Sequence, residues 1–308
     1  MPERLSRSML FVPASRPDMI AKAAASAADA VCLDLEDAVA PDLKESSRQH
    51  VVDALVRLDF GGRTRIVRVN GLDTMWTYRD VIEVVEGAGA HLDLLMLPKA
   101  GGAEDVAFVD RLLAQVEARA GVPHRIGLEA QIETARGFAY AREIAAASPR
   151  LEALIFGMGD YAASMRMPLA TIGAADGFDA DVPGSRWTAA LHGIVAAARA
   201  HGLRCMDGPL ATFRDEAALV RACRQARALG FDGKQCIHPA QLATVNAAFS
   251  PSAEEVAHAR RVVAAYEAAL AEGRGAVSLD GVMLDAVNIR MAQTTLRAAG
   301  ALPPSPSA

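Results

Sequence analysis

Eight short apolar segments alternate with longer helical stretches along most of the chain, and this alternation constrains the fold more than any other feature. Continuous runs rich in Val, Ile, Leu and Met are typical of strands buried on both faces of a parallel sheet. The segments cover residues 8–14, 30–37, 63–70, 92–99, 125–133, 151–160, 203–209 and 231–239. The Ala-rich stretches between them often end in Gly or Pro, as helices do. Eight strand–helix repeats predict an α/β fold, a (β/α)₈ TIM barrel, with a doubly wound open sheet as the alternative.

The predicted barrel occupies residues 1–245, and a C-terminal helical extension is expected over 246–300. The extension begins with Ser252 and has Glu255 three residues later, a capping box that predicts a helix start. The stretch "GAVSLDGVMLDAVNIRMAQTTLRAAG" then predicts a turn and a second helix. Residues 301–308, rich in Pro and Ser, predict a disordered tail.

The longest interval between a predicted strand and its helix is residues 161–186. It contains a Gly- and Asp-rich loop, 171–184, followed by Trp187. Long loops beside the C-terminal ends of barrel strands often serve as lids or specificity elements. We therefore expect this loop to shape the substrate pocket.

Composition excludes several classes of protein. A net charge of −5 argues against a nucleic-acid surface, which needs clustered Lys and Arg. The sequence contains no uncharged run of about 18 apolar residues, so no membrane span is expected, and the N-terminus lacks the pattern of a signal peptide. The four cysteines form no CxxC pair, which favours reduced, buried thiols and a cytoplasmic location.

Carboxylates follow three of the predicted strands. Asp34, Glu36 and Asp37 end the apolar segment "AVCLDLEDAV", Glu133 ends the fifth strand and Asp160 the sixth. Because the carboxyl ends of barrel strands meet at one mouth, these acids would repel one another unless a cation lay among them. Oxygen ligands without His or Cys favour a hard cation, most simply Mg²⁺. The alternative for any one of these acids is a helix N-cap.

Basic residues follow neighbouring strands. Arg68 ends the third strand, Lys99 the fourth, and Arg16 follows the first. An arginine beside a metal suits capture of a carboxylate or stabilisation of an enolate oxygen. The alternative is that these cations only neutralise the nearby acids.

Taken in order, seven sequence stretches resemble one protein family. They are "RSMLFVPASRPDMIAKA", "CLDLEDAV", "VRVN", "LPKA", "IETARG", "GMGD" and "DGKQCIHPAQ". The set is similar to the citrate lyase β-subunit and malyl-CoA lyase branch of the HpcH/HpaI aldolase superfamily, over residues 6–300. The resemblance implies a TIM barrel that cleaves or forms a carbon–carbon bond beside an acyl-CoA thioester.

The same resemblance implies roles for the polar residues. Glu133 and Asp160 would bind Mg²⁺, or Mn²⁺ in its place. Glu36 and Asp37 would hold metal-bound waters, and Arg68 would stabilise the enolate and the 2-oxo acid.

For the CoA thioester, the resemblance implies a site at the first and last strands. Phe11, Arg16 and Lys22 match positions that line the CoA site, and the two cations could bind its phosphates. Ile237 and Pro239 would flank the pantetheine arm.

A C-terminal aspartate completes the implied site. Asp285 matches the family's acid–base residue, which reaches into a neighbouring subunit, so a homotrimer or homohexamer is expected. Asp280 remains an alternative, and His238 is interpreted as part of a turn rather than as a base.

The function implied is a lyase acting on a 3-hydroxyacyl-CoA such as malyl-, citramalyl- or citryl-CoA. The products would be acetyl-CoA or propionyl-CoA and a 2-oxo acid. An acyl-CoA thioesterase, a CoA-independent 2-oxo acid aldolase and a subunit of a citrate lyase complex remain alternatives.

Overall fold

The computed structural model describes residues 4–182 and 185–302. These residues form two compact units, 4–247 and 248–302, which are described separately. The division lies inside helix α10 (Leu242–Phe249), close to the boundary expected at residue 245.

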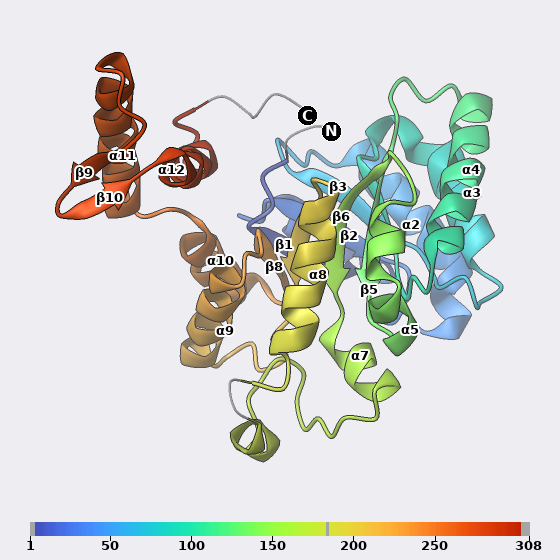
Figure 1. Ribbon diagram of the computed structural model, residues 1–308. Helices are drawn as coiled ribbons and strands as arrows, with labels where there is room; N and C mark the ends of the chain where they lie inside the picture. The colour runs from blue at the N-terminus through green and yellow to red at the C-terminus, as the bar shows by residue number, and fades with distance from the viewer. Residues whose placement is uncertain (1–3, 183–184, 303–308) are drawn as a thin grey trace. The chain divides into compact units, whose positions relative to one another are not determined.

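The larger unit is a closed barrel of eight parallel strands (Figure 1). Each strand pairs with the next in the chain, and β1 pairs with β8 to close the barrel. The strands are β1 (Ser8–Pro13), β2 (Ala30–Asp34), β3 (Thr64–Arg68), β4 (Leu94–Leu97), β5 (Gly127–Ile132), β6 (Leu151–Phe156), β7 (Arg204–Asp207) and β8 (Gly233–Cys236). The predicted TIM barrel is confirmed, and the open-sheet alternative is wrong.

Helices follow the strands and cover the outside of the barrel. They are α1 (Pro17–Ala24), α2 (Lys44–Arg57), α3 (Thr77–Ala88), α4 (Ala103–Ala120), α5 (Ala135–Ala139), α6 (Ala141–Ala145), α7 (Met158–Ser164), α8 (Thr188–Ala200), α9 (Glu216–Ala228) and α10. Across the described part of the chain, none of the helices combines the length and the apolarity that crossing a membrane requires.

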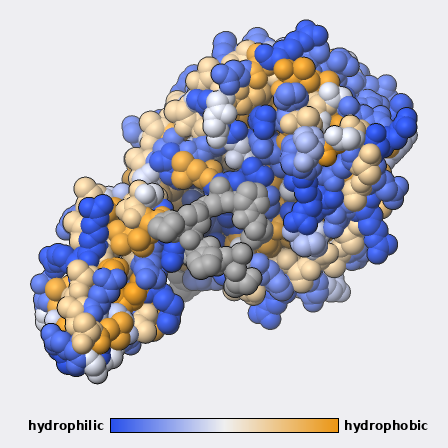
Figure 2. Space-filling model, turned by 90° about the horizontal axis from the view of Figure 1, so that it is seen from above, coloured by the Kyte–Doolittle hydropathy of each residue, from blue (hydrophilic) through white to orange (hydrophobic). Residues whose placement is uncertain are grey.

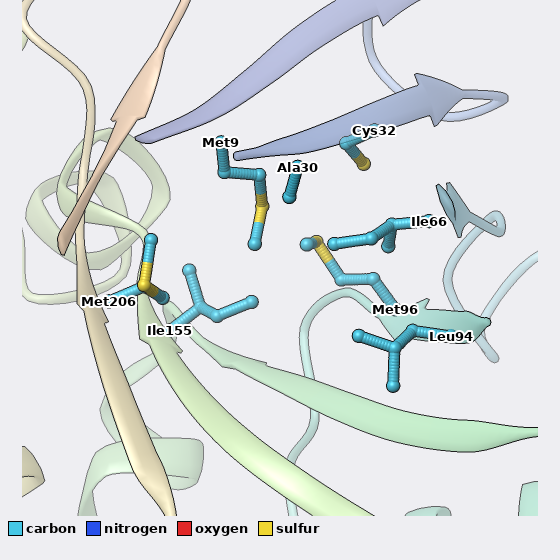
Figure 3. Packing of buried hydrophobic residues seen from close by; sticks show 8 residues of the cluster. All are labelled: Met9, Ala30, Cys32, Ile66, Leu94, Met96, Ile155 and Met206. Atoms are coloured by element: carbon cyan, nitrogen blue, oxygen red, sulfur yellow. The ribbon is translucent and has the colours of Figure 1, made fainter. Parts of the chain in front are cut away.

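The core of the barrel consists of inward-facing side chains from six strands, whose side chains point toward one another in Figure 3. They are Met9, Ala30, Cys32, Ile66, Leu94, Met96, Ile155 and Met206. Successive residues of a strand point to opposite faces. Residues two positions after Cys32 and Ile66 therefore also face the barrel interior, and these are Asp34 and Arg68.

The loop between α7 and α8 is held by ion pairs of its own. It contains a short 3₁₀ helix, η3 (Gly177–Asp181), which Asp176 caps. Arg186 pairs with Asp176 at 2.8 Å and with Asp179 at 3.2 Å. Of the loop predicted over 171–184, residues 183 and 184 lie outside the described part, and its role as a specificity element remains a prediction.

The smaller unit contains α11 (Ala253–Ala271), a hairpin of β9 (Val277–Leu279) and β10 (Val282–Leu284), and α12 (Ala286–Ala298). The predicted capping box of Ser252 and Glu255 begins α11. Where a turn was predicted, the structure has a two-stranded hairpin. Residues 303–308 of the predicted tail lie outside the described part of the chain.

Apolar side chains also lie on the surface of this unit, between charged ones (Figure 2). They belong to the hairpin and α12: Val282, Met283, Val287 and Met291, each at least half exposed. Such a patch is common at protein–protein interfaces.

Candidate active site

Polar side chains collect at the C-terminal ends of β2 to β6, where the strands leave the core. Asp34 and Arg68 are register partners at the ends of β2 and β3, and Glu133 directly follows β5. All three are buried. The strand alternation directs them into the mouth of the barrel, as predicted for acids at strand ends.

Arg68 is held in one orientation by Asp34 and Phe11. Its Nε and Nη2 atoms donate hydrogen bonds of 2.7 and 2.6 Å to the two carboxylate oxygens of Asp34. Asp34 also accepts backbone N–H bonds from Glu36 and Ala38. The Phe11 ring lies 5.1 Å from the guanidinium carbon. A bidentate pair of this kind fixes the plane of the guanidinium, and Nη1, which takes no part in it, faces Glu36.

Glu36 lies between two cations. Its Oε2 is 2.9 Å from Nη1 of Arg68, and its Oε1 contacts the ammonium of Lys99. Lys44 donates to the backbone carbonyls of Leu35 and Glu36 and so fixes the loop after β2. Burial raises the pKa of Glu36. Asp37 is more exposed and lies 3.4 Å from Lys99, so of the two acids Glu36 is the one built into the site.

Glu133 has both carboxylate oxygens engaged by N–H donors. The backbone N–H of Lys99 donates to Oε1 at 2.8 Å, and the Gln131 amide donates to Oε2 at 2.6 Å. Lys99 has a positive φ of 51°, uncommon for a residue with a side chain. Burial, and then the nearby charges of Glu36 and Asp160, raise the pKa of Glu133 to about 8. This carboxyl group is therefore neutral near pH 7 unless a cation binds it.

Asp160 is not on a strand, in contrast to the prediction. β6 ends at Phe156, and Asp160 lies in the first turn of α7, with Gly157 at the N-cap position. It is thus neither a strand end nor an N-cap. No described residue donates a hydrogen bond to its side chain, yet it lies near enough to Glu133 to affect that pKa. Its oxygens are available to a ligand.

The charge balance of the mouth fits a divalent cation. The acids outnumber the bases by two, so a formal charge of −2 remains when all are ionised. The acids are Asp34, Glu36, Asp37, Glu133 and Asp160, and the bases are Lys44, Arg68 and Lys99.

The donor set also fits. Over residues 4–182 and 185–302, no three His, Cys, Asp or Glu side chains are grouped as metal ligands. Mg²⁺ is commonly bound by one or two carboxylates, with water or substrate oxygens completing its shell. Glu133 and Asp160 could serve as such a pair, and the buried Oε1 of Gln131 beside Glu133 accepts no hydrogen bond from a described residue.

The residues expected at a CoA site are brought to neighbouring strands. Arg16 and Lys22 are exposed at α1, after β1, where Arg16 pairs with Asp18 at 2.9 Å. Ile237 and Pro239 are exposed after β8, which pairs with β1. The five expected residues, Phe11 included, therefore belong to one side of the barrel, and their contact with CoA remains a prediction.

His238 has a structural role in the same region. Its Nδ1 accepts the Ala240 N–H at 3.1 Å and caps the 3₁₀ helix Pro239–Gln241. Its ring stacks on Phe213 with centroids 4.5 Å apart. This agrees with its interpretation as a turn residue.

The two C-terminal aspartates have different partners. Asp285 is the N-cap of α12 and forms a capping box with Asn288. Asp280 forms an ion pair with Arg261 on α11. Asp285 is thus a helix-start residue, while its carboxylate remains partly exposed.

Comparison with known proteins identifies the family. The sequence pattern of the HpcH/HpaI aldolase/citrate lyase family matches residues 7–239. The L-malyl-CoA/beta-methylmalyl-CoA lyase of Rhodobacter capsulatus is 44% identical over 97% of this chain and 96% of its own length. A (3S)-malyl-CoA thioesterase of Cereibacter sphaeroides is 39% identical over 96% of this chain and 95% of its own.

A solved structure agrees with these relatives. CitE of Mycobacterium tuberculosis, crystallised with magnesium, acetoacetate and coenzyme A, has a TM-score of 0.75 and 34% identity, covering 95% of this chain and 97% of that one. The resemblance seen in the sequence motifs is confirmed: the chain belongs to the HpcH/HpaI aldolase/citrate lyase family.

Proposed function

We propose that this protein is a Mg²⁺-dependent carbon–carbon lyase acting on a 3-hydroxyacyl-CoA such as malyl-CoA. Cleavage yields acetyl-CoA, or propionyl-CoA from a methylated substrate, and a 2-oxo acid such as glyoxylate. The observation that carries the proposal is the meeting of Glu133, Asp160 and Arg68 at the mouth of a barrel that is 44% identical to a malyl-CoA/methylmalyl-CoA lyase.

The residues of the site suit this chemistry. When bound, Mg²⁺ would act as a Lewis acid and a template for the substrate oxygens. Arg68 can donate hydrogen bonds to the oxygen on which charge develops as the carbon–carbon bond breaks. In cleavage a base takes the hydroxyl proton, the carbon–carbon bond breaks with its electrons passing to the thioester enolate, and protonated Asp285 would then protonate the enolate carbon. Condensation reverses these steps, with Asp285 as the base.

A substrate panel tests the proposal against its alternatives. Malyl-, methylmalyl-, citramalyl- and citryl-CoA would be incubated with Mg²⁺, and both free 2-oxo acid and free thiol would be measured. A lyase releases the 2-oxo acid without thiol, whereas a thioesterase releases thiol without the 2-oxo acid. Release of a 2-oxo acid from a free hydroxy acid would indicate a CoA-independent aldolase. Release of none of these products from the isolated chain would instead favour a subunit of a larger lyase complex.

We also propose a homo-oligomer, a trimer or hexamer, in which Asp285 enters a neighbouring subunit's site. The exposed apolar patch on the hairpin and α12 supports such an interface. A cytoplasmic location is proposed as well, and the four buried free cysteines support it.

Replacing Arg68 by lysine is expected to lower kcat roughly 10²–10³-fold, as loss of an oxyanion donor does. Lysine keeps the charge but cannot pair with Asp34 through two parallel hydrogen bonds. Steady-state kinetics would measure the loss. Arg65→Lys is the matched control, because Arg65 lies on the same strand, faces the other side and pairs with Asp93 at 2.8 Å. Equal rates in Arg68→Lys and in the control would refute a role for Arg68 in the reaction.

Cation binding is expected to release close to one proton at pH 7. The Glu133 carboxyl has a pKa of about 8 without a cation, so it is mostly protonated at pH 7 and must ionise to bind Mg²⁺. Affinity should therefore rise from pH 6 to pH 8 and level off above that. Calorimetry in two buffers of different ionisation enthalpy measures the proton. Glu133→Gln should release none, and a pH-independent affinity in the unmodified protein would contradict this expectation.

A further inference from the structure

Glu133 is held by two donors, the backbone N–H of Lys99 after β4 and the side-chain amide of Gln131 on β5. Gln131 lies near the end of β5, two residues before Glu133 and on the same face of the strand. Its Nε2 donates to Oε2 of Glu133 at 2.6 Å, while the Lys99 N–H occupies Oε1. The orientation of Glu133 is therefore set from both sides.

The carbonyl oxygen of the Gln131 amide has no hydrogen-bond partner among the described residues. The side chain is only 4% exposed, and its Oε1 accepts no hydrogen bond from any described residue. A buried acceptor without a donor is costly. Buried side-chain acceptors are normally paired with protein or water, so this oxygen indicates a missing O–H donor beside Glu133.

Gly157 makes room for this arrangement. Its φ is −102°, which any residue adopts, so the glycine is not needed for the backbone. A Cβ there would lie 2.3 Å from Glu133 Oε2 and 2.9 Å from Gln131 Nε2. Only a residue without a side chain leaves the Gln131–Glu133 hydrogen bond intact.

We propose that Gln131 is a positioning residue for the cation site, with Gly157 as the residue that accommodates it. Its N–H fixes Glu133 for the cation, and its Oε1 accepts a hydrogen bond from a water molecule on the cation. The inference rests on the proposed function, because it assumes that Glu133 is a metal ligand. Groups that orient metal ligands typically change metal affinity 10–100-fold when removed.

The test measures Mn²⁺ binding without substrate, by the EPR signal of free Mn²⁺, together with the melting temperature of the cation-free protein. Gln131→Met removes both the donor and the acceptor and is expected to weaken Mn²⁺ binding at least tenfold. The matched control is Gln235→Met, since Gln235 is also a buried glutamine and is the register partner of Met9 in the barrel interior. It should bind Mn²⁺ as the unmodified protein does, and both variants should melt at similar temperatures.

A second variant covers the case in which Gln131→Met melts well below its control. Gly157→Ala keeps both polar side chains but forces them apart, and it should also weaken Mn²⁺ binding at least tenfold. The inference is overturned if the variants that fold bind Mn²⁺ as tightly as Gln235→Met does.

A third variant, Glu133→Gln, tests the cation site itself and so distinguishes a failure of this inference from a failure of the proposed function. Glu133→Gln should bind Mn²⁺ far more weakly than the unmodified protein. If it binds equally well, the cation site itself is wrong and the role of Gln131 falls with it. If Glu133→Gln loses binding while the Gln131 and Gly157 variants do not, the cation site stands and only the positioning role is wrong.

Discussion

Glu133→Gln and Asp160→Asn are each expected to abolish the Mg²⁺-dependent release of a 2-oxo acid while the barrel stays folded. Each substitution keeps the size of the side chain and removes one of the two carboxylates available to the cation. A hard cation binds neutral amide oxygens less well than carboxylates. Activity with malyl-CoA, and Mg²⁺ binding by calorimetry, would measure the loss.

The melting temperature of the cation-free protein distinguishes loss of cation binding from loss of the fold. The pKa of Glu133 is raised to about 8 in the folded protein, from an ordinary value of 4.5. The unfolded chain ionises this glutamate at a lower pH than the folded protein does. The cation-free fold therefore loses stability progressively as the pH rises from about 4.5 to about 8. Glutamine cannot ionise, so Glu133→Gln in EDTA at pH 8 should melt no lower than the unmodified protein. Glu143→Gln, an exposed glutamate on α6, is the control for the substitution. Full activity in EDTA or in either site variant would refute the metal assignment.

The barrel was predictable because strands such as β1, β2, β4 and β6 are short apolar runs. Their regular alternation with helical stretches predicts the rest, including β8, whose sequence is Gly–Lys–Gln–Cys. Helix α2 shows where that reading fails. Its first turns bury Lys44, Ser47 and Arg48, and Arg48 reaches Asp80 on α3 at 2.7 Å. The apolar residues of its buried face, Val51, Ala54 and Leu55, follow only in its second half. The polar first half of the buried face shortens the apolar stripe, so periodicity reveals this helix poorly.

The sequence predicts which charged residues lie in the site. It does not predict which of them form hydrogen bonds with one another. The expectation of acids at strand ends identified Asp34, Glu36, Asp37, Glu133 and Asp160, and the family resemblance assigned the metal to Glu133 and Asp160. That Asp34 would bind Arg68 through two hydrogen bonds depends on the register of β2 and β3. The only sequence signal for this ion pair is the position of Asp34 two residues before Glu36, which places both side chains on the same face of the segment.

Gln131 and Gly157 carried no signal of their own. A glutamine in an apolar strand and a glycine before a helix are both common. Their importance comes from the lack of space between them and Glu133, since a Cβ at Gly157 would lie 2.3 Å from Glu133 Oε2. Asp160 was assigned to a strand for a related reason. The Gly–Met–Gly sequence before it fits a strand end as well as a helix start, and only the backbone decides between them.

Asp285→Asn subunits mixed with Glu133→Gln subunits are expected to regain activity that neither has alone. If Asp285 enters a neighbouring barrel, some mixed sites receive Glu133 from one chain and Asp285 from another. Random mixing in equal amounts gives about a quarter of the sites both groups, in any closed ring of subunits. If Asp285 acts within its own chain, no site has both.

Asparagine is the right substitution because Asp285 is also the N-cap of α12. Alanine at an N-cap costs about 1 kcal/mol of stability, whereas asparagine caps nearly as well as aspartate. Asp285→Asn therefore removes the proton donor and keeps the helix start. Asp280→Asn is the control, since Asp280 pairs with Arg261 on the surface of the same unit, and it should stay active. Absence of recovery, with subunit exchange verified by mass spectrometry of tagged chains, would mean that Asp285 does not act across an interface. Recovery would mean that the barrel, complete as a fold, obtains its acid–base group only through assembly.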